Sequence, residues 1–319
     1  MRFAFTDDQL AFRDVVAELF EKECPPLVVR AAWENETGRT DRGWDALGEM
    51  GVLGALAPES SGGLGLSELD AVLLLEASGR AALPEPLVEH AMVAAPIIPA
   101  GLRTVTAALG PSALVPYVDS ADAVLVEDDD RLLLVSRSAL IVEPRPSVDR
   151  SRHVAVVDWD AGAGEVTEIG GANVVAAAFD RGALGTAAQL LGLTAALLDT
   201  TVEYVVQRQQ FGAPIGSYQA IKHKLADVRV ALEFARPLAY RAAYSLAHDD
   251  PEGSIHVSMA KARAGDAATL AATHALQCHG AIGYSFEYDL HLWMKRAWAL
   301  VASWGDGAWH RERVARSIL

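Results

Sequence analysis

Two short segments of this 319-residue chain carry side chains that could bind a phosphate-bearing ligand. In the first segment, Arg208 is followed closely by Phe211 and Gly212. A guanidinium presents a rigid fork of donors to phosphate oxygens, and an aromatic ring offers an apolar face beside it. Taken alone, however, an exposed arginine at a helix end is more often solvated or paired with a carboxylate.

The second segment covers residues 277–283 and reads QCHGAIG. Glycines such as Gly280 and Gly283 let backbone amides come closer to a ligand than residues with side chains allow. Considered alone, Gln277 is an ordinary residue at a helix end. For His279 we expect packing or a backbone hydrogen bond, because no cluster of further metal ligands accompanies it.

The composition excludes several kinds of partner. The 42 acidic side chains outnumber the 27 basic ones and give a formal charge of −15, which disfavours nucleic acids and anionic membrane surfaces. The two cysteines, Cys24 and Cys278, lie too far apart for a disulfide framework or a zinc set, so they fit a reducing compartment. Apolar-rich stretches such as 186–198 are interrupted before they reach membrane-spanning length, and the N-terminus does not resemble a signal peptide. We therefore expect a cytoplasmic protein.

The elements that position these segments fall into three zones, predicted as domains over residues 1–104, 105–180 and 181–319. In the first zone, Thr6 and Gln9 have the spacing of a capping box before an amphipathic helix. A second helix is predicted to follow residues 65–67 and to end near Gly79, after a turn-rich loop over residues 57–65.

In the second zone the pattern of apolar residues changes from helical to β-type. Strands are predicted over 123–127 and 131–136, joined by a turn of three aspartates, and over 153–159. The third zone is again helical, with predicted helices over 185–207, from Ser217 as N-cap to about 247, over 254–278, and a last pair within 286–317. This order predicts an α+β fold: an N-terminal helical domain, a small β domain and a C-terminal four-helix bundle.

Three groups of residues, in order along the chain, resemble the acyl-CoA dehydrogenase family. The first lies within 51–65 (GVLGALAPESSGGLG). The second is 208–219 (RQQFGAPIGSYQ), continued by 222–227 (KHKLAD). The third is 277–284 (QCHGAIGY), followed by Glu287-Tyr288-Asp289 and Lys295-Arg296. Together they extend over nearly the whole chain.

The resemblance implies a cofactor, FAD, bound between two subunits. In this family the middle β domain of one chain holds the isoalloxazine ring, and the two glycine-containing turns of another chain hold the pyrophosphate and adenosine. Transferred residue by residue, this implies cofactor contacts from Arg208, Gln210, Phe211, Tyr218, Gln219, Gln277, Gly280, Ala281 and Gly283.

The chain departs from the family where the flavin ring and the catalytic base belong. The family's Thr-Glu-Pro…Gly-Ser-Asp and Trp-Ile-Thr segments are both missing from the β zone, which is short for the family. The resemblance places Trp304 where many relatives carry the proton-abstracting glutamate, and Gly182 where a minority carry it. Neither side chain can accept a proton, so no catalytic residue is predicted. The nearest carboxylate, Asp306, is expected to serve a turn or an N-cap.

The resemblance therefore implies a subunit of a heteromeric enzyme. The chain keeps what the family donates across an interface and lacks what a chain supplies to its own flavin. This pattern is similar to the α2β2 acyl-CoA dehydrogenases of actinobacteria, in which a full-length partner subunit carries the base. It implies α,β-dehydrogenation of a bulky acyl-CoA, such as a steroid side-chain thioester, with electrons passing to an electron-transfer flavoprotein.

Two other functions remain open from the sequence. The chain could be a self-sufficient flavoenzyme of altered chemistry, such as an oxidase, that uses Asp306 or no base. Alternatively, it could be a non-catalytic scaffold that binds flavin or acyl-CoA.

Overall fold

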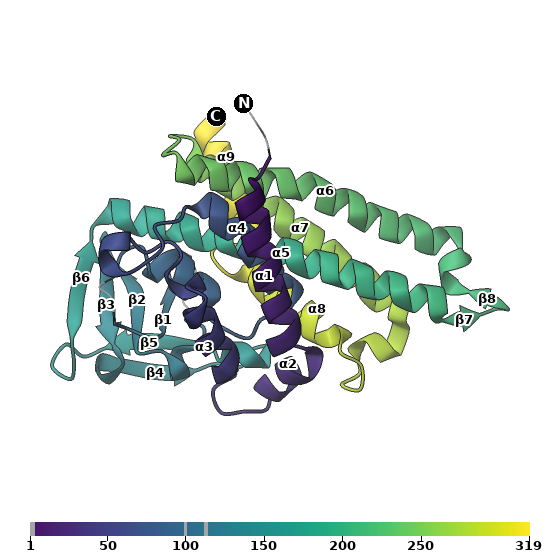
Figure 1. The fold of residues 1–319 in the computed structure, drawn as a ribbon, viewed down its shortest axis with the longest axis horizontal. Coiled ribbons are helices and arrows are strands. Elements are labelled where there is room, and N and C mark those ends of the chain that lie inside the picture. Colours follow the sequence, from purple (N-terminus) through teal and green to yellow (C-terminus); the bar gives the residue numbers. More distant parts are fainter. Residues whose placement is uncertain (1–3, 99–100, 112–113) are drawn as a thin grey trace.

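The structure, a computed structural model, describes residues 4–98, 101–111 and 114–319. Figure 1 shows a small β region at one end of the molecule and a long helical arm that extends to the other end. The N-terminal helices lie across the middle of the long helices. The predicted α+β arrangement of helical, β and helical parts is confirmed.

The N-terminal part contains the two helices that their caps predicted. Helix α1 (Asp7–Glu23) begins after Thr6, whose side chain accepts from the Gln9 amide at 3.2 Å. The Gln9 side chain in turn accepts from the Thr6 amide at 2.9 Å, which completes the capping box. Helix α4 (Glu68–Arg80) follows Ser67, as predicted.

Other N-terminal elements were not predicted. Helices α2 (Pro26–Ala32) and α3 (Asp41–Glu49) connect α1 to the turn-rich loop, which contains the short helices η1 (Val52–Gly54) and η2 (Glu59–Ser61). After α4 comes a buried π-helix, η3 (Val88–Ala94). A π-helix is rare, and its wider hydrogen-bond spacing has no simple sequence pattern.

The β region contains a mixed four-stranded sheet and a separate two-stranded ribbon. The sheet has the order β1-β2-β3-β6, where only β1 and β2 are parallel. Strands β2 and β3 were predicted, and Asp129 between them has the positive φ of a turn. The predicted strand over 153–159 forms as β5. The strand bounds are β1 (Val105–Ala108), β2 (Ala123–Asp128), β3 (Arg131–Ser136), β4 (Leu140–Pro144), β5 (Ala155–Trp159) and β6 (Val166–Gly170).

The C-terminal part is built from three long helices and two shorter ones. They are α5 (Ala172–Gln207), α6 (Gln219–Ala247), α7 (Gly253–His279), α8 (Leu290–Ala302) and α9 (Gly307–Ile318). Helix α5 begins well before the predicted start at residue 185, so the predicted boundary after residue 180 lies inside it. The prediction of Ser217 as N-cap is wrong: Tyr218 occupies that position, and the Ser217 hydroxyl donates to the carbonyl of Pro214.

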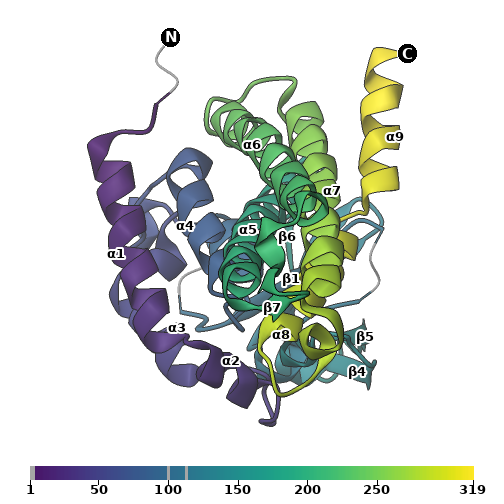
Figure 2. The ribbon, with the colours of Figure 1, turned by 90° about the vertical axis from the view of Figure 1, so that its right-hand side faces the viewer.

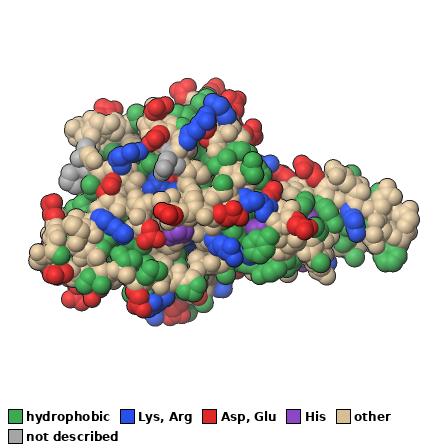
Figure 3. Space-filling model, turned by 90° about the horizontal axis from the view of Figure 1, so that it is seen from below, with side chains coloured by type: hydrophobic (Ala, Val, Ile, Leu, Met, Phe, Trp, Pro, Cys, Tyr) green, Lys and Arg blue, Asp and Glu red, His purple; other side chains and the backbone are tan. Residues whose placement is uncertain are grey.

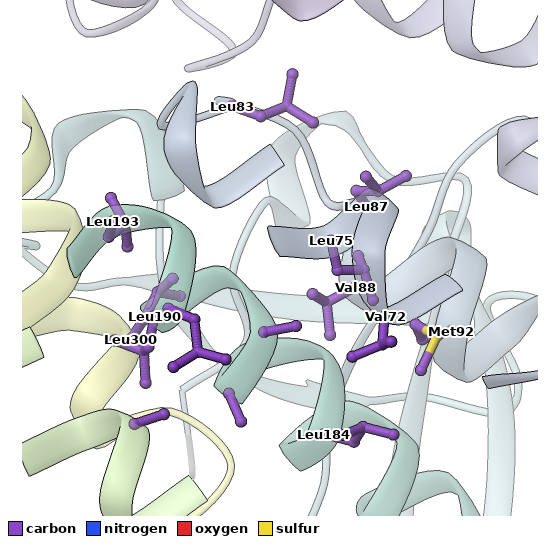
Figure 4. Close-up of a cluster of buried hydrophobic side chains, with 14 of the residues drawn as sticks. Val72, Leu75, Leu83, Leu87, Val88, Met92, Leu184, Leu190, Leu193 and Leu300 are labelled. Atoms are coloured by element: carbon purple, nitrogen blue, oxygen red, sulfur yellow. The ribbon is translucent and has the colours of Figure 1, made fainter. Parts of the chain in front are cut away.

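Helix α5 is the core helix of the molecule. By length and composition it could cross a membrane, but 94% of its most apolar window is buried inside the protein. Figure 4 shows its leucines packed against side chains of α4 and η3. The α4–α5 contact depends on glycine, because a Cβ at Gly192 would lie 1.9 Å from the carbonyl oxygen of Glu76.

Candidate functional site

The two regions singled out in the sequence lie far apart on helix α5. Arg208 is its C-cap, whereas Gly182 lies in its N-terminal third. At 1.5 Å per residue, roughly 40 Å of helix separates them.

At the exposed end, Arg208 leads into a hairpin formed by β7 (Gln209–Gln210) and β8 (Ala213–Pro214). Its backbone is fixed at both sides: its amide donates to the Tyr204 carbonyl, and its carbonyl accepts from the Ile215 amide, each at 2.8 Å. Its side chain is exposed and makes no ion pair with any described residue. Figure 1 shows this hairpin at the tip of the helical arm.

The other predicted cofactor residues of this segment surround the same hairpin. Phe211 has a left-handed backbone, and its residue is 94% exposed. Tyr218 donates its hydroxyl to the Gln210 carbonyl at 3.0 Å, which fixes the turn. Gln210 and Gln219 are exposed. An aromatic side chain held this far into solvent is ready to contact another molecule.

The second glycine-containing segment meets the end of α5 through stacked rings. The Tyr204 ring stacks on the His279 imidazole, with centroids 4.1 Å apart. His279 also hydrogen-bonds the Ala275 carbonyl through Nδ1 at 2.8 Å, so its predicted role in packing and backbone bonding is confirmed. The structure therefore brings the helix ends that carry Arg208 and Gln277 onto the same part of the arm, as Figure 2 shows from the tip.

The glycines of the second segment differ from each other. Gln277, Gly280 and Ala281 are exposed, and Gly280 has a positive φ with open space where a Cβ would be. Gly283, by contrast, is buried, and a Cβ there would lie 2.9 Å from the Cβ of His279. Open backbone is thus available to a ligand at Gly280, whereas at Gly283 protein atoms already fill the space.

At the buried end, Gly182 and Trp304, the two positions where the resemblance places the base, face each other. A Cβ added at Gly182 would lie 2.4 Å from the Trp304 indole, far below any normal contact. Trp304 itself is only 4% exposed. These positions were assigned separately from the sequence, and their direct contact supports both assignments. The space between them is filled by an indole.

The turn that carries Trp304 is held from several sides. Trp304 has a φ of 56° and Gly305 a φ of 84°, so two successive residues are left-handed. A tryptophan rarely adopts this backbone, and it persists only where the surroundings enforce it. Lys261 Nζ donates to the carbonyls of Val301 at 3.1 Å and Gly305 at 3.0 Å. His310 hydrogen-bonds the Trp304 carbonyl through Nε2 at 2.8 Å.

Burial shifts the titration of both supporting side chains. It lowers the pKa of Lys261 to about 7, and it lowers the pKa of His310 to about 4, with a further contribution from Lys261. His310 is therefore neutral at pH 7, which makes Nε2 the donor to Trp304 and Nδ1 the acceptor from the Ser258 hydroxyl. Lys261 and His310 therefore both donate hydrogen bonds to backbone carbonyls of the turn that carries Trp304.

Asp306 takes the structural role expected from the sequence. Its carboxylate accepts from the Trp309 amide at 2.8 Å and caps α9. Around it, aromatic rings close the region: the Phe179 ring lies 6.2 Å from Trp304 and 5.0 Å from Trp309, centroid to centroid. These rings leave the buried end apolar and densely packed.

The sequence reasoning missed a buried polar chain next to this turn. Glu89, on η3, lies 3.8 Å from Arg152, and Arg152 donates to the Ser303 hydroxyl at 2.9 Å. Burial raises the pKa of Glu89, opposed by Arg152. Its signal in the sequence was the pair Glu89-His90 inside an otherwise apolar run, which is unusual for charged residues.

Comparisons with protein families give two matches along the chain. The family described as "Acyl-CoA dehydrogenase, N-terminal domain" matches residues 6–111, and "Acyl-CoA dehydrogenase, C-terminal domain" matches residues 170–319. Among curated proteins, the acyl-CoA dehydrogenase IpdE2 of Mycolicibacterium smegmatis is 32% identical over 305 residues, covering 92% of this chain and 93% of the relative.

Solved structures share the fold over the full length. The ChsE4-ChsE5 complex from Mycobacterium tuberculosis has a TM-score of 0.87 at 23% identity, covering 100% of this chain and 99% of that chain. A Tcur3481-Tcur3483 steroid ACAD variant has a TM-score of 0.85 at 22% identity, covering 98% of each chain. A structure described as an FAD-dependent dehydrogenase has a TM-score of 0.84 at 21% identity, covering 100% of this chain and 99% of that chain.

Proposed function

This chain belongs to the acyl-CoA dehydrogenase family, and we propose that it is the non-catalytic subunit of a heteromeric, FAD-dependent member. It contributes one half of an FAD site, and a full-length partner subunit contributes the other half. The partner supplies the pocket for the isoalloxazine ring and the carboxylate that removes the α-proton. We also propose that residues 1–104, 105–180 and 181–319 form the three domains of this subunit.

One observation carries the proposal: the Trp304 indole lies on Gly182. Both positions that relatives use for the base are without a carboxylate, and the room for one is occupied. A substrate α-carbon needs a base within hydrogen-bond reach of its proton. The carboxylates near this turn have partners within the chain: Asp306 caps α9, and Glu89 lies 3.8 Å from Arg152. We therefore propose that the base comes from another chain.

The exposed end supports the other half of the proposal. FAD, when bound, supplies the acceptor for the β-hydride. The residues of this chain would hold its phosphates: Arg208 with a free guanidinium and Gly280 with an open backbone. Arg208 lies roughly 40 Å along α5 from Gly182, on which Trp304 packs, and His279, next to Gly280, stacks on Tyr204 near the Arg208 end. These residues are too far from Trp304 to serve a reaction beside it in the same chain. They suit a flavin whose ring is held by a neighbour.

The relatives narrow the proposed substrate and partner. Similar structures are described as a ChsE4-ChsE5 complex and as a steroid ACAD, so two different chains and a steroid substrate have precedents within this fold. We therefore propose an α2β2 heterotetramer in the cytoplasm that dehydrogenates a bulky acyl-CoA, with steroid side-chain thioesters as the first candidates. Electrons would pass from the complex to an electron-transfer flavoprotein.

Co-expression with a full-length relative that retains the glutamate tests this proposal. We expect the two chains to copurify with FAD and to dehydrogenate a steroid acyl-CoA. Replacing the partner's glutamate with glutamine should abolish the reaction, whereas Trp304→Phe in this chain should leave it intact. A homo-oligomer of this chain that binds FAD stoichiometrically and oxidises acyl-CoA without a partner would contradict the proposal.

A further inference from the structure

A cavity of about 380 Å³ lies between Trp33 at the C-terminal end of α2, residues within 144–155, and Asp119. Its lining includes Trp33, Arg150 and His153. Figure 3 shows the face on which α2 and β4 lie, where basic side chains stand next to apolar ones. None of the cofactor residues named above lines this cavity.

The cavity has an excess of positive charge. Three carboxylates near it form ion pairs: Glu143 with Arg145, Asp149 with Arg296, and Asp289 with Arg30. A fourth, Asp119, lies 3.1 Å from Nδ1 of His153. Arg150 and Lys295, in contrast, form no ion pair with any residue of the described ranges. Burial and the neighbouring Arg150 lower the pKa of Lys295. These two adjacent unpaired cations make the region locally positive on a chain whose formal charge is −15.

Aromatic rings surround these two cations. Lys295 Nζ lies 5.3 Å from the Trp33 ring, 5.2 Å from Tyr284 and 4.6 Å from Phe286. The Arg150 guanidinium lies 5.3 Å from the Phe286 ring. Trp33 and Arg150 also line the cavity, so the cluster and the cavity are continuous. Ring faces attract a cation but do not neutralise it.

A histidine beside Lys295 has no hydrogen-bond partner. His291 is 1% exposed, and neither ring nitrogen has a partner among the described residues. Its ring lies 5.1 Å from Trp33 and 4.9 Å from Phe286, inside the same cluster. Native proteins rarely leave both nitrogens of a buried histidine unsatisfied, so such a group indicates a missing partner.

From the unpaired Arg150 and Lys295, the orphaned His291 and the adjoining cavity, we propose that this cluster binds a phosphate group. Arg150 would provide forked donors, Lys295 a point charge, and His291 a neutral donor. Tyr284 and Phe286 are 53% and 50% exposed, so they could contact a planar ring attached to that phosphate. The site is separate from the Arg208 hairpin, but Tyr284 directly follows Gly283 of the second glycine-containing segment. The proposal does not depend on the proposed function.

The test uses the full chain alone, titrated with inorganic phosphate, pyrophosphate and coenzyme A. Binding is followed by the fluorescence of tryptophan, because Trp33 lines the cavity, and by calorimetry. We expect saturable binding that weakens with salt. Tighter binding of coenzyme A than of pyrophosphate would identify a nucleotide-type ligand, whereas equal binding would identify the phosphate alone.

Matched variants decide whether the cluster is responsible. Arg150→Ala and Lys295→Met should each weaken binding roughly tenfold, the scale of one charge-assisted hydrogen bond. Arg131→Ala removes the same charge from β3, away from the cavity, and should change binding less than twofold. Because Lys295 is largely buried, the melting curve of Lys295→Met is also measured. If that variant unfolds, Arg150→Ala alone tests the proposal, since Arg150 is exposed.

Two outcomes would overturn the proposal. One is that none of the three probes binds at millimolar concentration. The other is that Arg150→Ala and Arg131→Ala bind equally well, which would assign any observed binding to general surface charge. In either case, if the Arg150→Ala variant also assembled less well with a partner chain, a carboxylate of that partner would be the counter-charge of Arg150.

Discussion

The two ends of helix α5 treat their functional positions in opposite ways. At one end, Trp304 is buried on Gly182, and its turn is held by Lys261 and His310. At the other end, Phe211 is 94% exposed, and the Arg208 side chain forms no ion pair with any described residue. The side chains at the buried end contact other parts of the same chain. Those at the exposed end are in contact with solvent and are free to bind another molecule.

Under the proposed function, this difference reflects a family site that is divided between two chains. A lost catalytic residue leaves space in the core, and an unfilled cavity costs free energy roughly in proportion to its volume. Under the proposed function, the Trp304 indole fills this space and makes it part of the core. Donors at the tip of an arm cost the isolated chain little, so they can be kept for a partner.

The largest contrast should be between the isolated chain and the complex. Purified alone, this chain should contain little FAD and show no acyl-CoA oxidation, because it lacks a base at Trp304 and Gly182. Trp304→Glu should not create activity in the isolated chain, since proton abstraction also requires a flavin correctly placed for the hydride. Absorbance at the flavin bands and an acyl-CoA turnover assay measure both expectations.

The second prediction concerns the buried end. Trp304→Ala should lower the free energy of unfolding by about 3–5 kcal/mol, because it removes a buried aromatic side chain and leaves a cavity over Gly182. Urea denaturation of the isolated chain measures the loss. Added indole should restore part of the stability by refilling the space. A change below about 1 kcal/mol would mean that this end is not closed as described.

The third prediction follows the pKa of Lys261, which burial lowers from 10.5 to about 7. Between these values the unfolded chain binds a proton that the folded chain does not, so stability rises with pH above about 7. The slope approaches roughly 1.4 kcal/mol per pH unit. Below pH 7 both states are protonated, and the contribution is constant.

Lys261→Met tests this slope directly. The difference in unfolding free energy between the two proteins should change by up to roughly 2.7 kcal/mol from pH 7 to pH 9. Other titrating groups are common to both proteins, so the comparison removes them. Parallel curves for the wild type and the variant over this range would show that Lys261 keeps an ordinary pKa.

The fourth prediction addresses the exposed end through Arg208. Arg208→Ala should leave the stability of the isolated chain unchanged but weaken FAD binding in the complex roughly tenfold to a hundredfold, for a loss of about 1.5–3 kcal/mol. Arg208→Lys should recover only part, because it keeps the charge without the fork. A flavin titration of the apo-complex and a melt of the single chain separate the two roles. An unchanged dissociation constant with a lowered melting temperature would make Arg208 a structural residue.

The smallest effect is expected at Phe211. Because its side chain is almost fully exposed, Phe211→Ala should change the stability of the isolated chain by less than about 0.5 kcal/mol. In the complex, loss of an aromatic contact of about 0.5–1.5 kcal/mol should weaken FAD binding by up to roughly tenfold. Equal and large losses of stability from Phe211→Ala and Trp304→Ala would remove the contrast between the two ends.

The sequence alone determined the features that depend on neighbouring residues. The capping box at Thr6 and Gln9, the helix after Ser67, strands β2 and β3, and the cap at Asp306 all formed as expected. Caps, turns and periodic patterns involve groups only a few residues apart, so local physical chemistry fixes them. The sequence also indicated the family, which the comparisons show.

The tertiary structure alone decided how distant positions meet. Helix α5 begins at Ala172 and continues through Gly182 and Gly185, because burial against the rest of the core outweighs the low helix propensity of glycine. Whether Gly283 faces a ligand or the protein depends on His279 and Leu290, which packing places beside it. The contact of Gly182 with Trp304 joins positions more than a hundred residues apart. Such contacts arise only when the whole chain packs, and no local pattern encodes them.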